Sequence, residues 1–159
     1  DGVRTPMHWT PDRNAGFSSC DPGRLYLPVI MDPIYGYQGL NVEAQMRTSS
    51  SLLHWTRRMI ETRKRHPTFG LGTFTELGAS NPSVLAFVRE FGDDRVLCVN
   101  NLFRFPQPVE LDLRRYEGVV PVEMLGGMHF PRVGELPYLL TLPGHGFYWF
   151  TLPSKRDTP

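Results

Sequence analysis

The chain has 159 residues, 40% of them hydrophobic, and its 17 basic and 16 acidic side chains leave a formal net charge of +1. This composition allows a buried core and argues against wholesale disorder, while a nearly neutral chain gives no electrostatic case for binding nucleic acid or an anionic membrane surface. No apolar run approaches the roughly 20 residues of a membrane span, and a neutral ligand such as a sugar fits the composition better.

Two cysteines, Cys20 and Cys98, lie far apart in the sequence, without a CxxC pair or a zinc-ligand spacing. We therefore expect reduced thiols in a cytoplasmic protein, with no metal site and no cofactor in this chain. The 15 prolines and 15 glycines fall between short apolar runs rather than in one tract, a distribution that is typical of turns in a β-rich protein.

Residues 1–40 are predicted to form a long irregular loop. Proline recurs in it too often for a helix or a central strand, and a loop of this length inside a compact protein is either functional or disordered. Its aromatic residues favour an ordered, packed loop. With no strand or helix before it, this segment is interpreted as an active-site loop whose supporting strand lies outside the chain, which would make the chain the tail of a larger enzyme.

Three side chains at the start of the loop are candidates for contacting a sugar. The guanidinium of Arg4 can hold a carboxylate while donating to sugar hydroxyls, although a surface ion pair is the alternative. The imidazole of His8 can donate to a hydroxyl. The indole of Trp9 can stack on the C–H face of a sugar ring. Because tryptophan is usually well buried, however, we expect Trp9 to anchor the loop in the core.

The sequence shows no convincing pair of catalytic carboxylates. Chemistry at a glycosidic bond needs two carboxyl groups, one as acid and one as nucleophile or base. Asp1 and Glu43 are the carboxylates near the loop to be considered, and Glu43 starts a helical segment, where the helix dipole alone favours a carboxylate. Residues 12–16 lack the ligand pattern of a calcium loop. We therefore predict no catalytic residue and no metal ligand in this chain.

A short helical turn is predicted at 41–45 and a longer amphipathic helix at 50–66. Ser49 or Ser50 is expected to cap the longer helix, since a serine oxygen can accept from a free N–H of the first turn, and Pro67 marks its end. One such helix is marginal alone, so its apolar stripe should lie exposed or be covered by another copy of the chain. The stripe consists of Leu52, Trp55, Met59 and Ile60.

From residue 70 onward the apolar period changes to two, which predicts short strands packed as a small antiparallel β-sandwich. Residues 91–95, between two alternating runs, predict a hairpin. The expected strands are 73–77, 84–91, 95–101, 109–113, 119–124, 138–142 and 146–152.

The last of these strands is rich in aromatic residues. Alternation puts Phe147 and Trp149 on one face and Tyr148 and Phe150 on the other. An exposed binding platform is one interpretation, but we favour a buried strand that is covered on both faces.

The residues at 4–9, Arg-Thr-Pro-Met-His-Trp, followed by Asn-Ala-Gly-Phe at 14–17, resemble a motif of the α-amylase family (glycoside hydrolase family 13). The motif is found in the branch that contains oligo-1,6-glucosidases, sucrose isomerases and trehalose synthases. Longer runs at 32–38, 41–45 and 134–149 are more narrowly similar to the trehalose synthases of that branch. Where the family usually has glutamine this chain has His8, whose ring size and response to pH differ.

The resemblance implies an α+β fragment: the loop and last helix of a (β/α)8 barrel, followed by a C-terminal antiparallel β-sandwich. The implied domains are 1–67 as the end of the catalytic barrel, 68–153 as the sandwich and 154–159 as a tail. Barrels of this kind carry their active sites on such loops.

The implied reaction is the interconversion of maltose and trehalose by intramolecular glucosyl transfer, and the family's catalytic carboxylates all precede this segment. Of the family's pocket residues only the motif arginine carries over, to Arg4. It would pair with an aspartate from the missing barrel and approach the glucosyl hydroxyls. The chain alone would then be inactive.

Three alternatives stay open. An α-glucosidase-like hydrolase of the same family would use the same loop but release glucose. A carbohydrate-binding or structural module would make the sandwich the functional unit. The sandwich could also mediate contacts between the subunits of a homo-oligomer.

Overall fold

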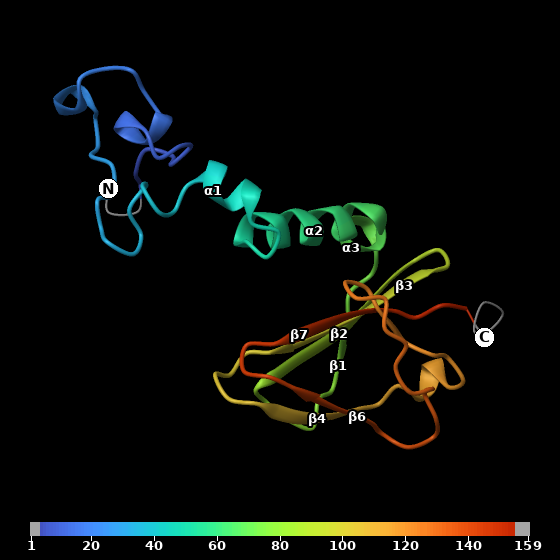
Figure 1. Cartoon of the computed structure of the whole chain (residues 1–159). Coiled ribbons are helices and arrows are strands. Elements are labelled where there is room, and N and C mark those ends of the chain that lie inside the picture. Colours follow the sequence, from blue (N-terminus) through green and yellow to red (C-terminus); the bar gives the residue numbers. More distant parts are fainter. Residues whose placement is uncertain (1–3, 155–159) are drawn as a thin grey trace. The chain divides into compact units, whose positions relative to one another are not determined.

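The computed structural model describes residues 4–154, and the chain divides into two compact units, Asp1–Met59 and Ile60–Pro159 (Figure 1). Asp1, considered above as a carboxylate near the loop, lies outside the described residues. The domain boundary expected at residue 67 stays a prediction.

The first unit begins with the irregular loop that the prolines predicted. Two short 3-10 turns, η1 at Arg13–Gly16 and η2 at Pro22–Arg24, interrupt its path. Asp21 caps η2, because its side chain accepts from the Gly23 N–H at 3.0 Å. The loop is therefore ordered by local turns.

Helix α1 spans Val42–Arg47, close to the expected helical turn. Its cap is the buried Asn41, whose side-chain oxygen accepts from the Ala44 N–H at 2.8 Å. The amide of Asn41 also donates to the Tyr37 carbonyl at 2.8 Å. One side chain thus ends the loop and starts the helix.

Helix α2 spans Leu52–Arg65 and confirms the predicted amphipathic helix. Its cap differs from the expectation of Ser49 or Ser50. The carbonyl of Ser51 accepts from the Trp55 N–H at 3.0 Å, and its hydroxyl accepts from the His54 N–H at 3.4 Å. Ser51 is the capping residue because the preceding serines lie in the turn before it.

The apolar stripe of α2 lies exposed in the chain as described. Leu52, Trp55 and Ile60 are 68%, 40% and 48% exposed, and no residue of the helix is buried. The stripe is thus uncovered within a single copy of the chain, and its cover by another copy stays a prediction. An apolar stripe of this kind is a surface on which other protein can pack.

The second unit is an antiparallel β-sandwich, as predicted (Figure 1). A five-stranded sheet has the order β1-β2-β3-β7-β5, and β4 pairs with β6 in a two-stranded sheet. A short helix, α3 at Thr68–Leu71, precedes the sheets, and a 3-10 turn, η3, lies at Arg114–Tyr116. The strands are β1 Thr75–Leu77, β2 Val84–Phe91, β3 Asp94–Asn101, β4 Gln107–Leu111, β5 Val122–Glu123, β6 Tyr138–Leu142 and β7 Phe147–Thr151.

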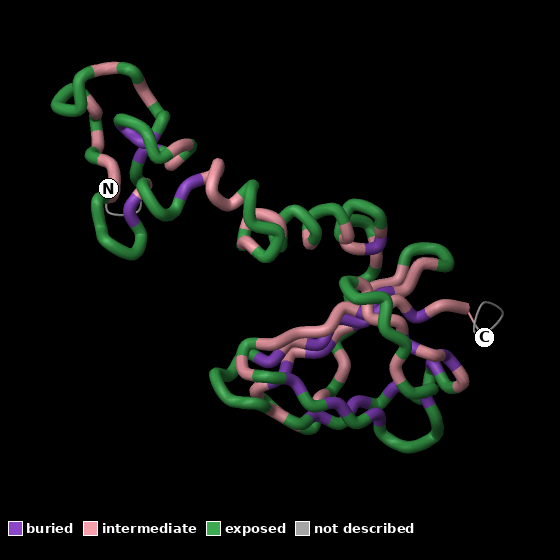
Figure 2. The backbone as a smooth tube through the Cα atoms, in the orientation of Figure 1, coloured by how far each residue is buried: buried purple, intermediate pink, exposed green. Residues whose placement is uncertain are grey.

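The core lies between the two sheets, where buried residues concentrate (Figure 2). Alternate residues of β2 and β6 are buried, which is the period-two pattern seen in the sequence. The hairpin expected at 91–95 joins β2 to β3, with Phe91 opposite Asp94 and Gly92 at a φ of 58°. Buried apolar contact is thus the main source of stability in this unit.

The final strand, β7, is covered less evenly than predicted. Phe150 is fully buried, and the ring of Tyr148 packs against the same core. Phe147 and Trp149, on the opposite face, are only half-buried. The ring of Phe69, from α3, lies 4.8 Å from that of Trp149. Full burial on both faces is therefore wrong, because the second face is covered only in part.

The segment that leads into the sandwich is tied to the sheet by polar contacts. The Asp94 carboxylate accepts from the Thr68 hydroxyl at 2.6 Å and lies 3.0 Å from Nδ1 of His66. Arg89, on β2, donates to the carbonyls of Phe69 and Gly72. These contacts satisfy carbonyls at the end of α3.

Candidate functional site

The start of the loop is organised around a left-handed turn at residues 14–16. Asn14, Ala15 and Gly16 have φ values of 56°, 59° and 66°. Asparagine tolerates this region better than most residues, and its amide donates to the carbonyls of Ser18 and Cys20 at 2.9 and 2.8 Å. Gly16 is required because a Cβ there would lie 2.5 Å from Oγ1 of Thr10.

Residues 8–10 are held through their main chain from two sides. The N–H groups of Trp9 and Thr10 both donate to the Ala15 carbonyl, at 2.8 and 3.1 Å. The carbonyls of His8 and Trp9 accept from the N–H groups of Val42 and Glu43, at 2.9 and 3.0 Å. Because Val42 and Glu43 open α1, these carbonyls satisfy two of its otherwise unpaired donors.

The ring of His8 is turned toward the loop. Its Nδ1 lies 3.1 Å from the Leu40 carbonyl, which can only accept, so Nδ1 carries the proton. Nε2 is buried and has no hydrogen-bond partner among the described residues. The ring edge also faces Tyr37, with centroids 6.1 Å apart. In this conformation His8 fastens the loop, and the expectation of a sugar contact from its ring stays a prediction.

Trp9 is 49% exposed, so the expectation that it anchors the loop in the core is wrong. Hydrogen bonds of its own main chain perform the anchoring, which leaves the indole available. An indole that is half exposed is the type of side chain that stacks on sugars.

Arg4 is exposed, and within residues 4–154 no hydrogen bond or ion pair reaches its guanidinium. It lines a small cavity of about 160 Å³. The sequence did not predict that Phe17 and Tyr26 line the same cavity as Arg4, although the aromatic residues of the loop indicated an ordered, packed segment. His8 and Trp9 are not among the residues lining it, which are Arg4, Thr5, Pro6, Phe17, Leu25, Tyr26 and Leu27.

The carboxylates of the described loop are engaged in local structure. Glu43 pairs with Arg47 one turn along α1, and Asp21 lies 3.5 Å from Arg13. Hydrogen bonds from the backbone N–H groups of Tyr35 and Ile34 lower the pKa of the Asp32 carboxyl. None of this resembles an acid held protonated for catalysis.

The remaining functional chemistry is sparse in the part of the chain that is described. Residues 4–154 contain no cluster of histidine, cysteine and acidic side chains that could hold a metal ion. Within the same range no helix is long and apolar enough to cross a bilayer. Both cysteines are free thiols.

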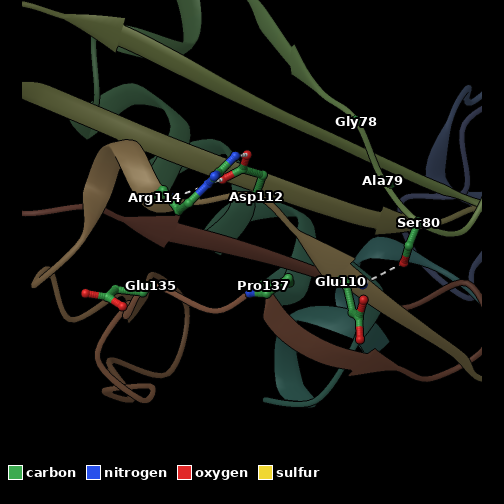
Figure 3. Close-up of a pocket in the computed structure, with 8 residues that line it drawn as sticks. All are labelled: Gly78, Ala79, Ser80, Glu110, Asp112, Arg114, Glu135 and Pro137. Atoms are coloured by element: carbon green, nitrogen blue, oxygen red, sulfur yellow. Dashed lines mark hydrogen bonds and ion pairs between the residues drawn. The ribbon is translucent and has the colours of Figure 1, made fainter.

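A larger groove, of about 510 Å³, lies on the sandwich (Figure 3). Asp112 and Arg114 form an ion pair in it, and the hydrogen bond from the Arg114 side chain lowers the Asp112 pKa to about 2. No aromatic ring lines the groove, so it lacks a stacking face for a sugar. Its lining residues are Gly78, Ala79, Ser80, Glu110, Asp112, Arg114, Glu135 and Pro137.

Two family models match successive parts of the chain. The model of the α-amylase catalytic domain matches residues 1–72, and that of the maltogenic amylase C-terminal domain matches residues 74–149. Together they extend over the loop, the helices and most of the sandwich.

The chain is also similar to named proteins along nearly its whole length. It is 70% identical to a trehalose synthase of Pimelobacter sp. (strain R48), over 99% of this chain and 28% of that protein. It is 66% identical to a trehalose synthase/amylase of Mycobacterium tuberculosis, over 98% of this chain and 26% of that protein. The chain thus spans about a quarter of the length of these relatives.

Solved structures share the same fold. A crystal structure of an α-glucosyl transfer enzyme is 26% identical and superposes with a TM-score of 0.72, covering 95% of this chain and 26% of that one.

Proposed function

Because the chain belongs to the α-amylase family, we propose that it is the C-terminal portion of a trehalose synthase, an enzyme that interconverts maltose and trehalose by intramolecular glucosyl transfer. The observation that carries the proposal is the 70% identity to a trehalose synthase over 99% of the chain. The exposed Arg4 and Trp9 of the loop support it, because these side chains suit a sugar.

In this proposal residues 1–67 complete the catalytic barrel, 68–153 form the C-terminal β-sandwich and 154–159 are a tail. The catalytic-domain model, which extends to residue 72, supports this division. The exposed stripe of α2 supports it as well, since a barrel helix needs an apolar face to pack on the strands. The two free thiols fit a reducing compartment, so we place the protein in the cytoplasm.

Arg4 is the residue to which we assign the main polar contact with substrate. Its guanidinium has no hydrogen-bond or ion-pair partner within the described residues, and Arg4 lines the same cavity as Phe17 and Tyr26. A carboxylate supplied by the barrel would hold one edge of the guanidinium, and the other edge would donate to hydroxyls of the glucosyl unit.

Trp9 and His8 have supporting parts. The exposed indole of Trp9 offers a flat face to a sugar ring. The ring of His8 fastens residue 8 to Leu40, and it reaches a sugar hydroxyl only if the loop moves on binding. The catalytic carboxylates come from the barrel, and exposed apolar side chains of the loop help to exclude water, which would otherwise hydrolyse the glucosyl-enzyme.

The test uses the full-length polypeptide that carries this chain, incubated with maltose. Trehalose is expected as the main product and free glucose as the minor one; glucose as the main product would identify an α-glucosidase-like hydrolase instead. The 159-residue chain alone should give no turnover, and turnover above buffer would contradict the assignment of the catalytic groups to the barrel.

Arg4→Lys tests the assigned contact. It keeps the charge and removes the planar fork, so kcat/KM should fall by about 100-fold. Arg24→Lys, at an exposed position of the same loop, is the matched control and should leave the rate unchanged. If the two substitutions changed kcat/KM equally, the assignment of Arg4 as a substrate contact would be wrong.

A further inference from the structure

The left-handed turn at residues 14–16 contains strain that a simple connection would avoid. Asn14 and Ala15 are not glycine, yet both have a positive φ, 56° and 59°. Asparagine tolerates this conformation better than most residues, but for alanine, which has a Cβ and no polar side chain, it is unfavourable. Strain of this kind persists only where the surrounding structure determines it, and it concentrates at functional sites.

The structure shows what holds the strained turn in place. The amide of Asn14 is buried and donates to two carbonyls, those of Ser18 and Cys20. Ala15 is fully buried. The main-chain N–H of Ala15 donates to the Asp12 carbonyl at 2.9 Å. The turn is therefore held by hydrogen bonds to its own neighbours.

The result of this arrangement is the direction of the Ala15 carbonyl. It accepts from the N–H groups of both Trp9 and Thr10, while the carbonyl of Trp9 accepts from Glu43 on the other side. Both polar groups of the Trp9 main chain are thus occupied, but the indole is 49% exposed. The hydrogen bonds therefore fix the main chain from which the ring projects.

We propose that the turn at residues 14–16 is a positioning element for Trp9: it holds the main chain so that the indole face meets a glucose ring of the substrate. This rests on the proposed function, because the sugar is the one acted on by the barrel. Ala15 and Asn14 touch no substrate and act through the Ala15 carbonyl. A preorganised ring stacks without losing conformational freedom on binding.

Ala15→Val in the full-length protein is the main test. A β-branched residue resists a positive φ, so the turn should open and KM for maltose should rise by about 3- to 10-fold, the worth of one stacked ring. The value of kcat should change less than about twofold, because stacking on the sugar stabilises substrate and transition state alike. Glycine adopts a positive φ readily, so the Ala15→Gly variant should keep the wild-type KM.

The decisive readout is the double substitution. In a Trp9→Ala background Ala15→Val should raise KM no further, since the ring that it displaces is gone. Additive effects would overturn the proposal. Ala86→Val, the same substitution at a buried alanine of β2, is the matched control: it should lower thermal stability without raising KM.

Two further measurements keep the outcomes distinct. If Ala15→Val does not fold, Asn14→Gly keeps the φ but removes both amide donors, and the same rise in KM and the same lack of additivity with Trp9→Ala are expected. The ¹⁹F resonance of 5-fluorotryptophan at position 9, assigned with Trp9→Phe, should shift in either variant even if the wild-type protein does not act on maltose. An unshifted resonance would overturn the positioning role, whereas inactive wild-type protein would overturn only the proposed function.

Discussion

The loop and the sandwich are ordered by different physical means. In the sandwich, apolar residues of facing strands are buried together, and Leu97, Leu142 and Phe150 have no exposed surface. In the loop, large apolar side chains such as Tyr26 and Met31 lie exposed, at 91% and 74%. The side chains buried there include the polar Asn14 and Asn41, whose amides each bind loop carbonyls.

This difference decides how each region responds to substitution. Burial is non-directional and is shared among many neighbours, so the sandwich tolerates conservative changes of apolar residue. A buried amide that binds two carbonyls is directional, and removing it leaves acceptors unsatisfied. The loop should therefore be sensitive at few positions and indifferent at the others, which suits a segment that presents side chains to a ligand.

The largest difference is expected in the rate of alkylation of the two cysteines, one of which lies in each region. Burial raises the pKa of the Cys98 thiol to about 12, so at pH 8 only about one Cys98 thiol in ten thousand is ionised. Cys20 is half-buried in the loop. Iodoacetamide at pH 8 should label Cys20 at least about a thousandfold faster than Cys98 in the folded chain, as followed by mass spectrometry of the peptides.

The same group gives a pH dependence with a definite sign. Because the pKa of Cys98 is raised from 9.0 to about 12 on folding, its neutral form is favoured in the folded state. The corresponding stabilisation is complete below pH 9 and is lost as the pH rises toward 12. Cys98→Ser should flatten the fall in unfolding free energy over that range; an unchanged slope would show that the buried thiol does not contribute.

A smaller difference is expected in the unfolding free energy that is lost when an aromatic residue of each region is replaced. Phe150→Ala removes a fully buried ring of the sandwich core and should lower the unfolding free energy by about 3–5 kcal/mol, measured by urea denaturation. Tyr26→Ala, in the loop, is the matched control and should change it by less than about 0.5 kcal/mol. Similar costs at the two positions would mean that the loop is also held by apolar burial.

The smallest effect is expected at the cap of α1. Asn41→Ala removes the oxygen that accepts from Ala44 and leaves the Tyr37 carbonyl without its donor, at a cost of about 1–2 kcal/mol. Hydrogen exchange at the Ala44 amide should report this as local opening. Asn41→Asp keeps the accepting oxygen and should recover part of the protection, and full loss in both variants would assign the effect to something other than the cap.

The extent to which the fold was predictable depends on the range of the interactions. The strands 84–91 and 138–142 coincide with β2 and β6 because alternation over a few residues reports which face is buried. The helix expected at 50–66 matches α2 to within two residues at each end. The cap at Ser51 was missed because neighbouring serines have the same chemistry and only the path of the preceding turn selects among them.

The candidate site was less predictable than the fold. The sequence singled out Arg4, His8 and Trp9 by side-chain chemistry, but it predicted a buried Trp9. The structure shows a half-exposed indole, whose main chain is held by the Ala15 carbonyl and the first turn of α1. These contacts join residues 9 and 43, a separation that no local pattern reports.

For this protein, local periodicity, turn residues and motif chemistry were sufficient to determine the succession of loop, helix and strands and the kind of ligand that the loop suits. Only the tertiary structure decided which side chains of the loop face outward, that residues 14 and 15 adopt a left-handed conformation, and that both Asn14 and Asn41 act as buried tethers. The reason is physical: periodicity depends on each residue's own polarity, whereas exposure and strain depend on which distant donor or acceptor the main chain meets.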